Sequence, residues 1–134
     1  MYLSLLSEKE KKLFLGYAHA LSSVDGYFSD EEKKMIDSYC YEMQLEFCAE
    51  DANRPIDAIV DDMYTFCGVQ ARKIVVFEAI GLAMSDGNYD KKERNLICST
   101  MKKFGIDENF EKDCVTFIGE YIKLQNKINN LVIG

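Results

Sequence analysis

The sequence contains one Pro, one His and no closely spaced pair of cysteines. With only eight Gly beside the single Pro, and 48% hydrophobic residues, it is neither collagen-like nor disordered. The first residues lack the basic stretch and apolar run of a signal peptide. The most apolar window, 74–84, is far shorter than the roughly 20 residues of a membrane span. We therefore expect a globular, cytoplasmic protein that does not enter a membrane.

Basic residues are outnumbered by acidic ones, 16 against 23, which leaves a net charge of -7. This balance opposes attraction to nucleic acid phosphates and anionic lipid. The lysines come in scattered pairs, such as Lys33-Lys34 and Lys91-Lys92, which is typical of solvated helix faces. We expect a protein partner rather than nucleic acid or a membrane, and the sequence leaves the oligomeric state open.

The cysteines are odd in number and widely spaced, whereas zinc sites normally use closely spaced ligand pairs. We expect reduced thiols that act as small buried apolar groups. The five are Cys40, Cys48, Cys67, Cys98 and Cys114.

Helix start signals recur along the chain, and strand signals do not. Capping boxes stand at Ser7 to Glu10 and at Ser29 to Glu32, Pro55 suits a first helical turn, and Gly68 separates that helix from the next. The window 74–84 is apolar on nearly every side, which predicts the central helix. A final helix, capped by Asp107, carries Phe110, Cys114, Phe117, Ile118, Tyr121 and Ile122. The sequence predicts one all-α domain over 1–134 with about six or seven helices.

An internal repeat relates residues 12–38 to residues 73–99, with eight identities in 27 positions at a shift of 61. Each copy reads as a helix, an Asp-Gly turn, an aromatic residue, a capping residue and a second helix. The aromatic residues, Phe28 and Tyr89, can pack against the following helical turn, either on the stems of Lys33 and Arg94 or on Met35 and Leu96. We predict two helical hairpins, in halves of about 8–50 and 69–105, that pack against each other.

Asp25 and Asp86 are the informative residues of the two turns. A carboxylate at a helix C-terminus faces the negative end of the helix dipole, at a cost of about 0.3–1 kcal/mol. Hydrogen bonds from turn amides can compensate for this cost. The alternative is a divalent cation, held together with Glu32 or Glu93 seven residues downstream. Both glutamates also have a purely structural interpretation, as the closing residues of capping boxes.

Both turns match the second half of an EF-hand calcium loop, from Asp25 to Glu32 and from Asp86 to Glu93. The first half is absent, because apolar or small residues stand where the leading ligands belong: Leu21, Ser23, Leu82 and Met84. Ordinary EF-hand affinity is therefore not expected. A weak cation site and a capping role both stay open.

The repeated pattern Ala-x-x-Leu-x-x-x-Asp-Gly-x-aromatic-x-x-x-Glu-x-x-x-Ile spans 18–36 and again 79–97. It resembles the TerB tellurite-resistance family, and the N-terminal domain of the DjlA co-chaperones is similar; the likeness covers about 8–122. The resemblance implies an all-helical domain with pseudo-twofold related halves. Members often carry a further acidic or polar residue two positions before the Asp-Gly, where this chain has Ser23 and Met84. The family's acidic residues, proposed to bind metal, correspond to Asp25, Glu32, Asp86 and Glu93.

Two further polar residues lie on expected helices. For His19, a half-buried or surface position is favoured over a catalytic base, because no Ser or Cys stands in the context of a nucleophile. For Glu78, within the apolar window, a buried hydrogen bond or a position at a polar edge of the helix is favoured over an acid with a raised pKa.

These observations favour a non-enzymatic, TerB-like binding or scaffold module, associated with stress or tellurite resistance, with a divalent cation at the two turns. The alternative is a metal-free protein-interaction domain that uses the acidic segment 46–62, which holds six acids and one base. A small metal-dependent hydrolase is disfavoured, because the chain lacks histidine ligands.

Overall fold

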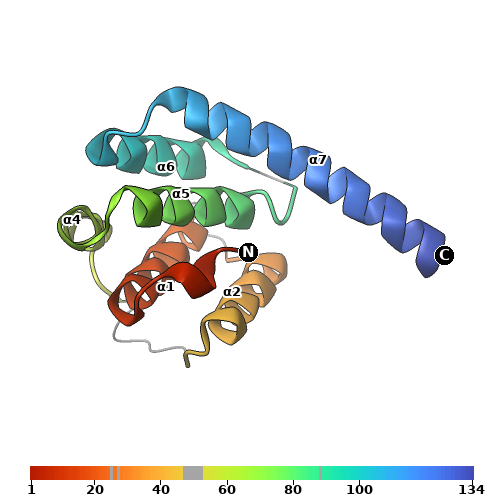
Figure 1. Ribbon diagram of the computed structural model, residues 1–134, viewed down its shortest axis with the longest axis horizontal. Coiled ribbons are helices and arrows are strands. Elements are labelled where there is room, and N and C mark those ends of the chain that lie inside the picture. Colours follow the sequence, from red (N-terminus) through yellow and green to blue (C-terminus); the bar gives the residue numbers. More distant parts are fainter. Residues whose placement is uncertain (25, 27, 47–52, 88) are drawn as a thin grey trace.

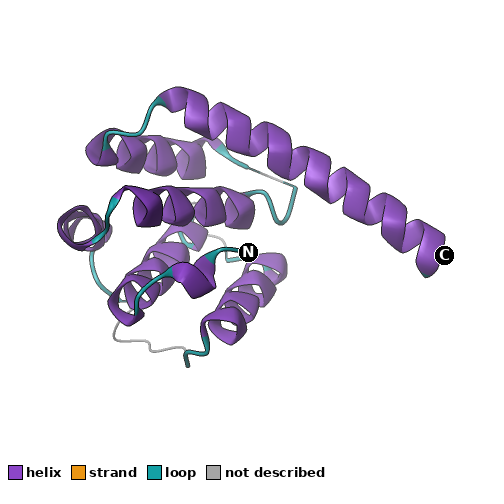
Figure 2. Cartoon of the chain, viewed as in Figure 1, coloured by secondary structure: helices purple, strands orange, loops and turns teal. Residues whose placement is uncertain are grey.

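The computed structural model describes residues 1–24, 26, 28–46, 53–87 and 89–134 (Figure 1). Within these residues every regular element is a helix and there is no strand, as the sequence predicts (Figure 2). A short 3-10 helix, η1 (Leu3–Leu5), precedes the α-helices. These are α1 (Glu8–Ser22), α2 (Asp30–Met43), α4 (Ile56–Phe66), α5 (Val69–Ala83), α6 (Lys91–Phe104) and α7 (Glu108–Val132).

Local structure recurs at the spacing of the sequence repeat. Helices α5 and α6 begin and end 61 residues after α1 and α2, respectively. Gly26 and Gly87, the glycines of the two turns, have φ angles of 81° and 77°, a left-handed conformation that favours Gly. The pseudo-twofold packing of the two halves stays a prediction.

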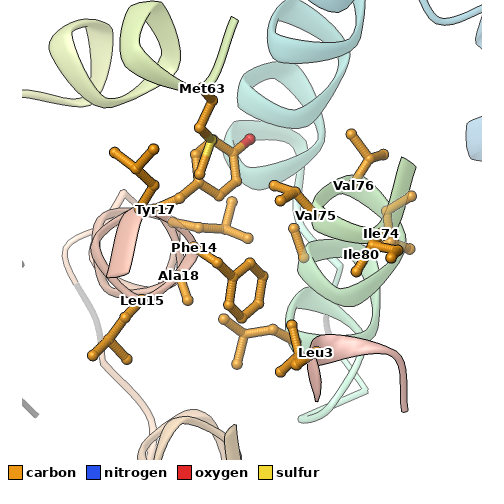
Figure 3. Packing of buried hydrophobic residues seen from close by; sticks show 14 of the residues in the cluster. Leu3, Phe14, Leu15, Tyr17, Ala18, Met63, Ile74, Val75, Val76 and Ile80 are labelled. Atoms are coloured by element: carbon orange, nitrogen blue, oxygen red, sulfur yellow. The ribbon is translucent and has the colours of Figure 1, made fainter. Parts of the chain in front are cut away.

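Helix α5 lies at the centre of the bundle, as its apolar pattern predicts. It contacts η1, α1, α2, α6 and α7, and Figure 3 shows its Val75 pointing toward the side chains of α1. A buried hydroxyl pair, Tyr17 Oη and Thr100 Oγ1 at 2.8 Å, links α1 to α6 within this core. Each large apolar side chain buried here contributes about 1.5–3 kcal/mol of transfer free energy.

The charged residue of α5, Glu78, is buried, and the favoured interpretation of a buried hydrogen bond is confirmed. Its Oε1 accepts from the backbone N–H of Tyr2 and from the amino group of Met1, both at 2.8 Å. Tyr39 of α2 donates its hydroxyl to the Glu78 carbonyl at 3.0 Å. The sequence could not indicate these partners, because they lie 39 to 77 residues away.

The cysteines follow the prediction in part. Cys40, Cys67 and Cys114 are buried, and burial raises the pKa of the Cys67 and Cys114 thiols to about 11. The prediction is wrong for Cys98, which is exposed. Its neighbour Ile97 takes the core-facing position of α6, which turns Cys98 about 100° away from the core. Cys48 lies outside the described residues.

Helix α7 is longer than the apolar pattern predicts. It runs for 25 residues, and its C-terminal half extends beyond the other helices in Figure 1. Cys114 and Ile118 are buried, whereas Phe117 and Tyr121 are exposed. Within the described part of the chain, no helix combines the length and the apolar character needed to cross a membrane.

The glycine requirement at the second turn is testable. An added Cβ at Gly87 meets no atom within 4 Å, so Gly87→Ala carries only the cost of the positive φ. We expect it to lower the free energy of unfolding by about 1 kcal/mol in urea denaturation. The control Gly81→Ala, with equally open space inside α5, should raise it by about 0.5–1 kcal/mol. Equal effects of the two substitutions would contradict the left-handed turn.

Candidate functional site

The first predicted site lies where α2 begins. Ser29 is the N-cap, and its Oγ accepts from the backbone N–H of Glu32 at 3.1 Å. In return, Glu32 Oε1 accepts from the backbone N–H and the hydroxyl of Ser29, both at 3.1 Å. The Glu32 residue is only 3% exposed. Asp25, the other predicted ligand of this turn, lies outside the described residues.

The second turn repeats this arrangement with a carboxylate cap. Asp90 Oδ1 accepts from the backbone N–H of Glu93 at 2.8 Å, and Glu93 Oε1 accepts from the backbone N–H of Asp90 at 3.4 Å. Glu93 is buried, and Asp86 is exposed. The capping role of both glutamates is therefore confirmed. It satisfies backbone donors that would otherwise lack partners at the start of each helix.

Among residues 1–24, 26, 28–46, 53–87 and 89–134, no three His, Cys, Asp or Glu side chains gather closely enough to hold a metal ion. The predicted ligand set includes Asp25 and so extends beyond the described residues. The cation site at Asp25, Glu32, Asp86 and Glu93 stays a prediction.

The structure adds a residue to the second turn that the sequence did not single out. Glu111 of α7 is 3% exposed. Its carboxylate accepts from Tyr89 Oη at 3.2 Å and lies 3.1 Å and 3.3 Å from Nε and Nη2 of Arg94. The ion pair to Glu111 raises the pKa of Arg94. Burial, together with the nearby Glu111 charge, raises the pKa of Tyr89 well above its usual range.

The sequence does indicate that Glu111 faces the core. Glu111 precedes Cys114 and Ile118 by three and seven residues, so an acidic residue occupies the core-facing side of an amphipathic helix. Such a residue needs a buried donor. The donors could not be identified, because Arg94 and Tyr89 lie 17 and 22 residues earlier in the chain.

In both turns the aromatic residue lies beside the basic residue five positions later, as predicted. Lys33 Nζ lies 5.6 Å from the centre of the Phe28 ring, and the Arg94 guanidinium lies 5.8 Å from that of Tyr89. The half-buried ring of His19 packs edge-on against Phe28, with centroids 5.5 Å apart. The expected half-buried position of His19 is therefore confirmed.

In the acidic segment 46–62 the structure describes residue 46 and residues 53–62. On its C-terminal side, Arg54 pairs with Asp62 at 2.6 Å, and Lys103 of α6 lies 3.3 Å from Asp61. Two of the acids on α4 are thus paired within the molecule. Residues 47–52 lie outside the described part of the chain.

The fold is similar to that of a solved tellurite resistance protein from Nostoc punctiforme. The two share 18% sequence identity at a TM-score of 0.66, over 96% of this chain and 84% of that one. No family model matches the chain, and no curated protein does. The chain therefore has a TerB-like helical fold, as the sequence resemblance implied.

The cap at the first turn predicts a stability change that needs no metal. Glu32→Ala leaves the backbone N–H of Ser29 without this acceptor, so we expect a loss of about 0.5–2 kcal/mol in chemical denaturation. The loss should already be present in chelator, because the cap itself needs no metal. The control Glu31→Ala, at an exposed position of the same helical turn, should change stability by less than about 0.5 kcal/mol. A Glu32→Ala effect no larger than that of the control would contradict the capping role.

The contact between the second turn and α7 predicts a different effect. Tyr89→Phe removes a hydroxyl that donates to buried Glu111, so we expect a loss of about 1 kcal/mol. Tyr41→Phe is the matched control, because Tyr41 is 88% exposed, and it should have no measurable effect. Because the pKa of Tyr89 is raised on folding, its contribution is present below about pH 10 and lost at higher pH. Equal losses in the two variants at pH 7 would refute the contact.

Proposed function

We propose that this protein is a non-enzymatic, TerB-like binding module of a tellurite or related stress response. The observation that carries this proposal is the fold likeness to a tellurite resistance protein over 96% of the chain. It is supported by the organisation of the two turns, where buried polar side chains hold helices in place. We assign the function to binding rather than to catalysis.

The ligand in this proposal is a divalent cation held by carboxylates of the two turns. Asp25, Glu32, Asp86 and Glu93 are the proposed ligands, and hard divalent cations prefer such oxygen donors. Because Glu32 and Glu93 already close capping boxes, a bound cation would share their carboxylates with backbone N–H groups. The proposal therefore requires weak binding.

The alternative is a metal-free interaction domain that docks a basic protein on the segment 46–62. It draws on the concentration of acids there, six against one base. The internal pairing of Asp61 and Asp62 lowers the charge available to such a partner. We therefore place the cation hypothesis first.

A calorimetric titration tests the cation site. Ca²⁺, Mn²⁺ or Zn²⁺ is added to chelator-stripped protein, and the heat and the melting temperature are recorded. We expect saturable binding in the micromolar to millimolar range and a rise in melting temperature, because a ligand that binds only the folded state stabilises it. The double variant Asp25→Asn/Asp86→Asn should abolish both signals.

The control is the double variant Asp37→Asn/Asp113→Asn, which makes the same change in net charge at exposed positions of α2 and α7. It should bind as the unmodified protein does. Curves that match the chelated control at millimolar ion would refute the cation site. A parallel assay of growth on tellurite, in a sensitive bacterium that expresses each variant, tests the stress role. Full protection by Asp25→Asn/Asp86→Asn would separate that role from the metal.

A further inference from the structure

Helix α7 carries a second apolar stripe that its own bundle does not cover. Its members recur at alternating spacings of four and three residues, which is the heptad pattern of a coiled coil. At 3.6 residues per turn they fall within about 80° of one another around the helix. They are Phe117, Tyr121, Leu124, Ile128 and Leu131, which are 61%, 49%, 57%, 50% and 85% exposed, respectively.

The stripe lies beside the face that packs on the bundle. That face is marked by Glu111, Cys114 and Ile118, all buried. From residue 120 to residue 132 every position of α7 is exposed. This part of α7 contains Asn126, Asn129 and Asn130, which are weak helix formers, and most helical stability in proteins comes from tertiary packing rather than from propensity. The protruding half of α7 therefore needs a partner surface to gain packing energy.

We propose that this stripe pairs with the same stripe of a second copy of the chain, as a short antiparallel two-helix coiled coil. The proposal does not depend on the cation hypothesis. In the heptad register, Tyr121 and Ile128 occupy a positions, and Phe117 and Leu124 occupy d positions. An antiparallel pair places a against d. Phe117 then lies opposite Ile128 of the second copy, and Tyr121 opposite its Leu124, with each layer repeated by symmetry.

Charge complementarity selects the antiparallel direction. The stripe is flanked on one side by Glu120 and Lys127, both at g positions of the same register. In the antiparallel alignment the g positions of the two copies face each other, so Glu120 lies opposite Lys127 of the second copy, and the reverse. A parallel pair would instead bring Glu120 next to Gln125, and Lys127 next to Val132. Only the antiparallel alignment forms two ion pairs between the copies.

The size of the contact sets the expected strength. The paired segments, 117–128, are about 18 Å long at 1.5 Å per residue. A contact between two single helices of this length is small beside the standard protein interface of about 1,600 Å². The dimer should therefore form at high protein concentration and dissociate on dilution.

Sedimentation velocity over a wide concentration range tests the surface. We expect the full chain to pass from its 15.4 kDa monomer to a particle of twice that mass as the concentration rises. Leu124→Asp should hold it as a monomer. The control Asn126→Asp introduces the same charge on the opposite side of α7 and should leave the dimer intact. Because both positions are exposed, circular dichroism should show the same helical bundle in both variants at low concentration.

Charge reversal tests the direction of the helices. Glu120→Lys alone, or Lys127→Glu alone, turns two attractive pairs into two repulsive ones and should raise the dissociation constant about tenfold. The combined variant Glu120→Lys/Lys127→Glu should restore the original value. In a parallel pair the reversed side chains would face Gln125 and Val132, so the single variants would match the unmodified protein.

Two results would overturn the pairing of the stripe with a second copy. One is a chain that stays monomeric at every concentration, which would leave the stripe to another occupant. The other is a dimer that Leu124→Asp does not dissociate, which would place the interface elsewhere. A dimer that Leu124→Asp dissociates but that the single charge reversals leave unchanged would overturn the antiparallel arrangement.

Discussion

The burial of α5 is the constraint on which the rest of the structure depends. A helix that is apolar on nearly every side cannot remain at the surface, so other elements must cover it. In this chain η1, α1, α2, α6 and α7 all contact it. The one acid among its buried residues, Glu78, is tolerated because backbone and amino donors of the first two residues reach its carboxylate. The core thereby fixes the position of the N-terminal residues as well as the helices.

One Asp-Gly turn lies between α1 and α2 and the other between α5 and α6. The buried glutamate that follows each turn already has a structural role. Glu32 and Glu93 complete capping boxes that start α2 and α6. A cation that drew either carboxylate away from its cap would oppose the start of that helix, at about 1 kcal/mol. Cation binding and folding would therefore be linked in this chain. The capping role, which needs no cation, is sufficient to explain why a glutamate recurs after both turns.

Sequence reasoning succeeded where the physical cause is local. Ser7, Ser29 and Asp107 were identified as caps because their partners lie within three residues. The contacts of Glu111 could not be predicted from the sequence. Arg94 and Tyr89 lie 17 and 22 residues away, and only the tertiary packing of α7 brings Glu111 to them. Periodicity also cannot tell which of two apolar stripes packs on its own bundle. Phe117 and Tyr121 carry the same apolar signal as Cys114 and Ile118, but only the latter two are buried. The four-residue cation site is undecided, since Asp25 lies outside the described residues.

The Glu111 contacts also decide which face α7 turns outward. A helix anchored only by apolar side chains can rotate a little about its axis, whereas a buried carboxylate fixed by Arg94 and Tyr89 has one favourable position. Phe117 follows Glu111 by six residues, which places it about 120° from Glu111 around the helix axis. Fixing Glu111 on the bundle therefore fixes the stripe in an outward direction. The second turn, which sequence reasoning singled out for its acids, thus also positions the apolar surface of α7.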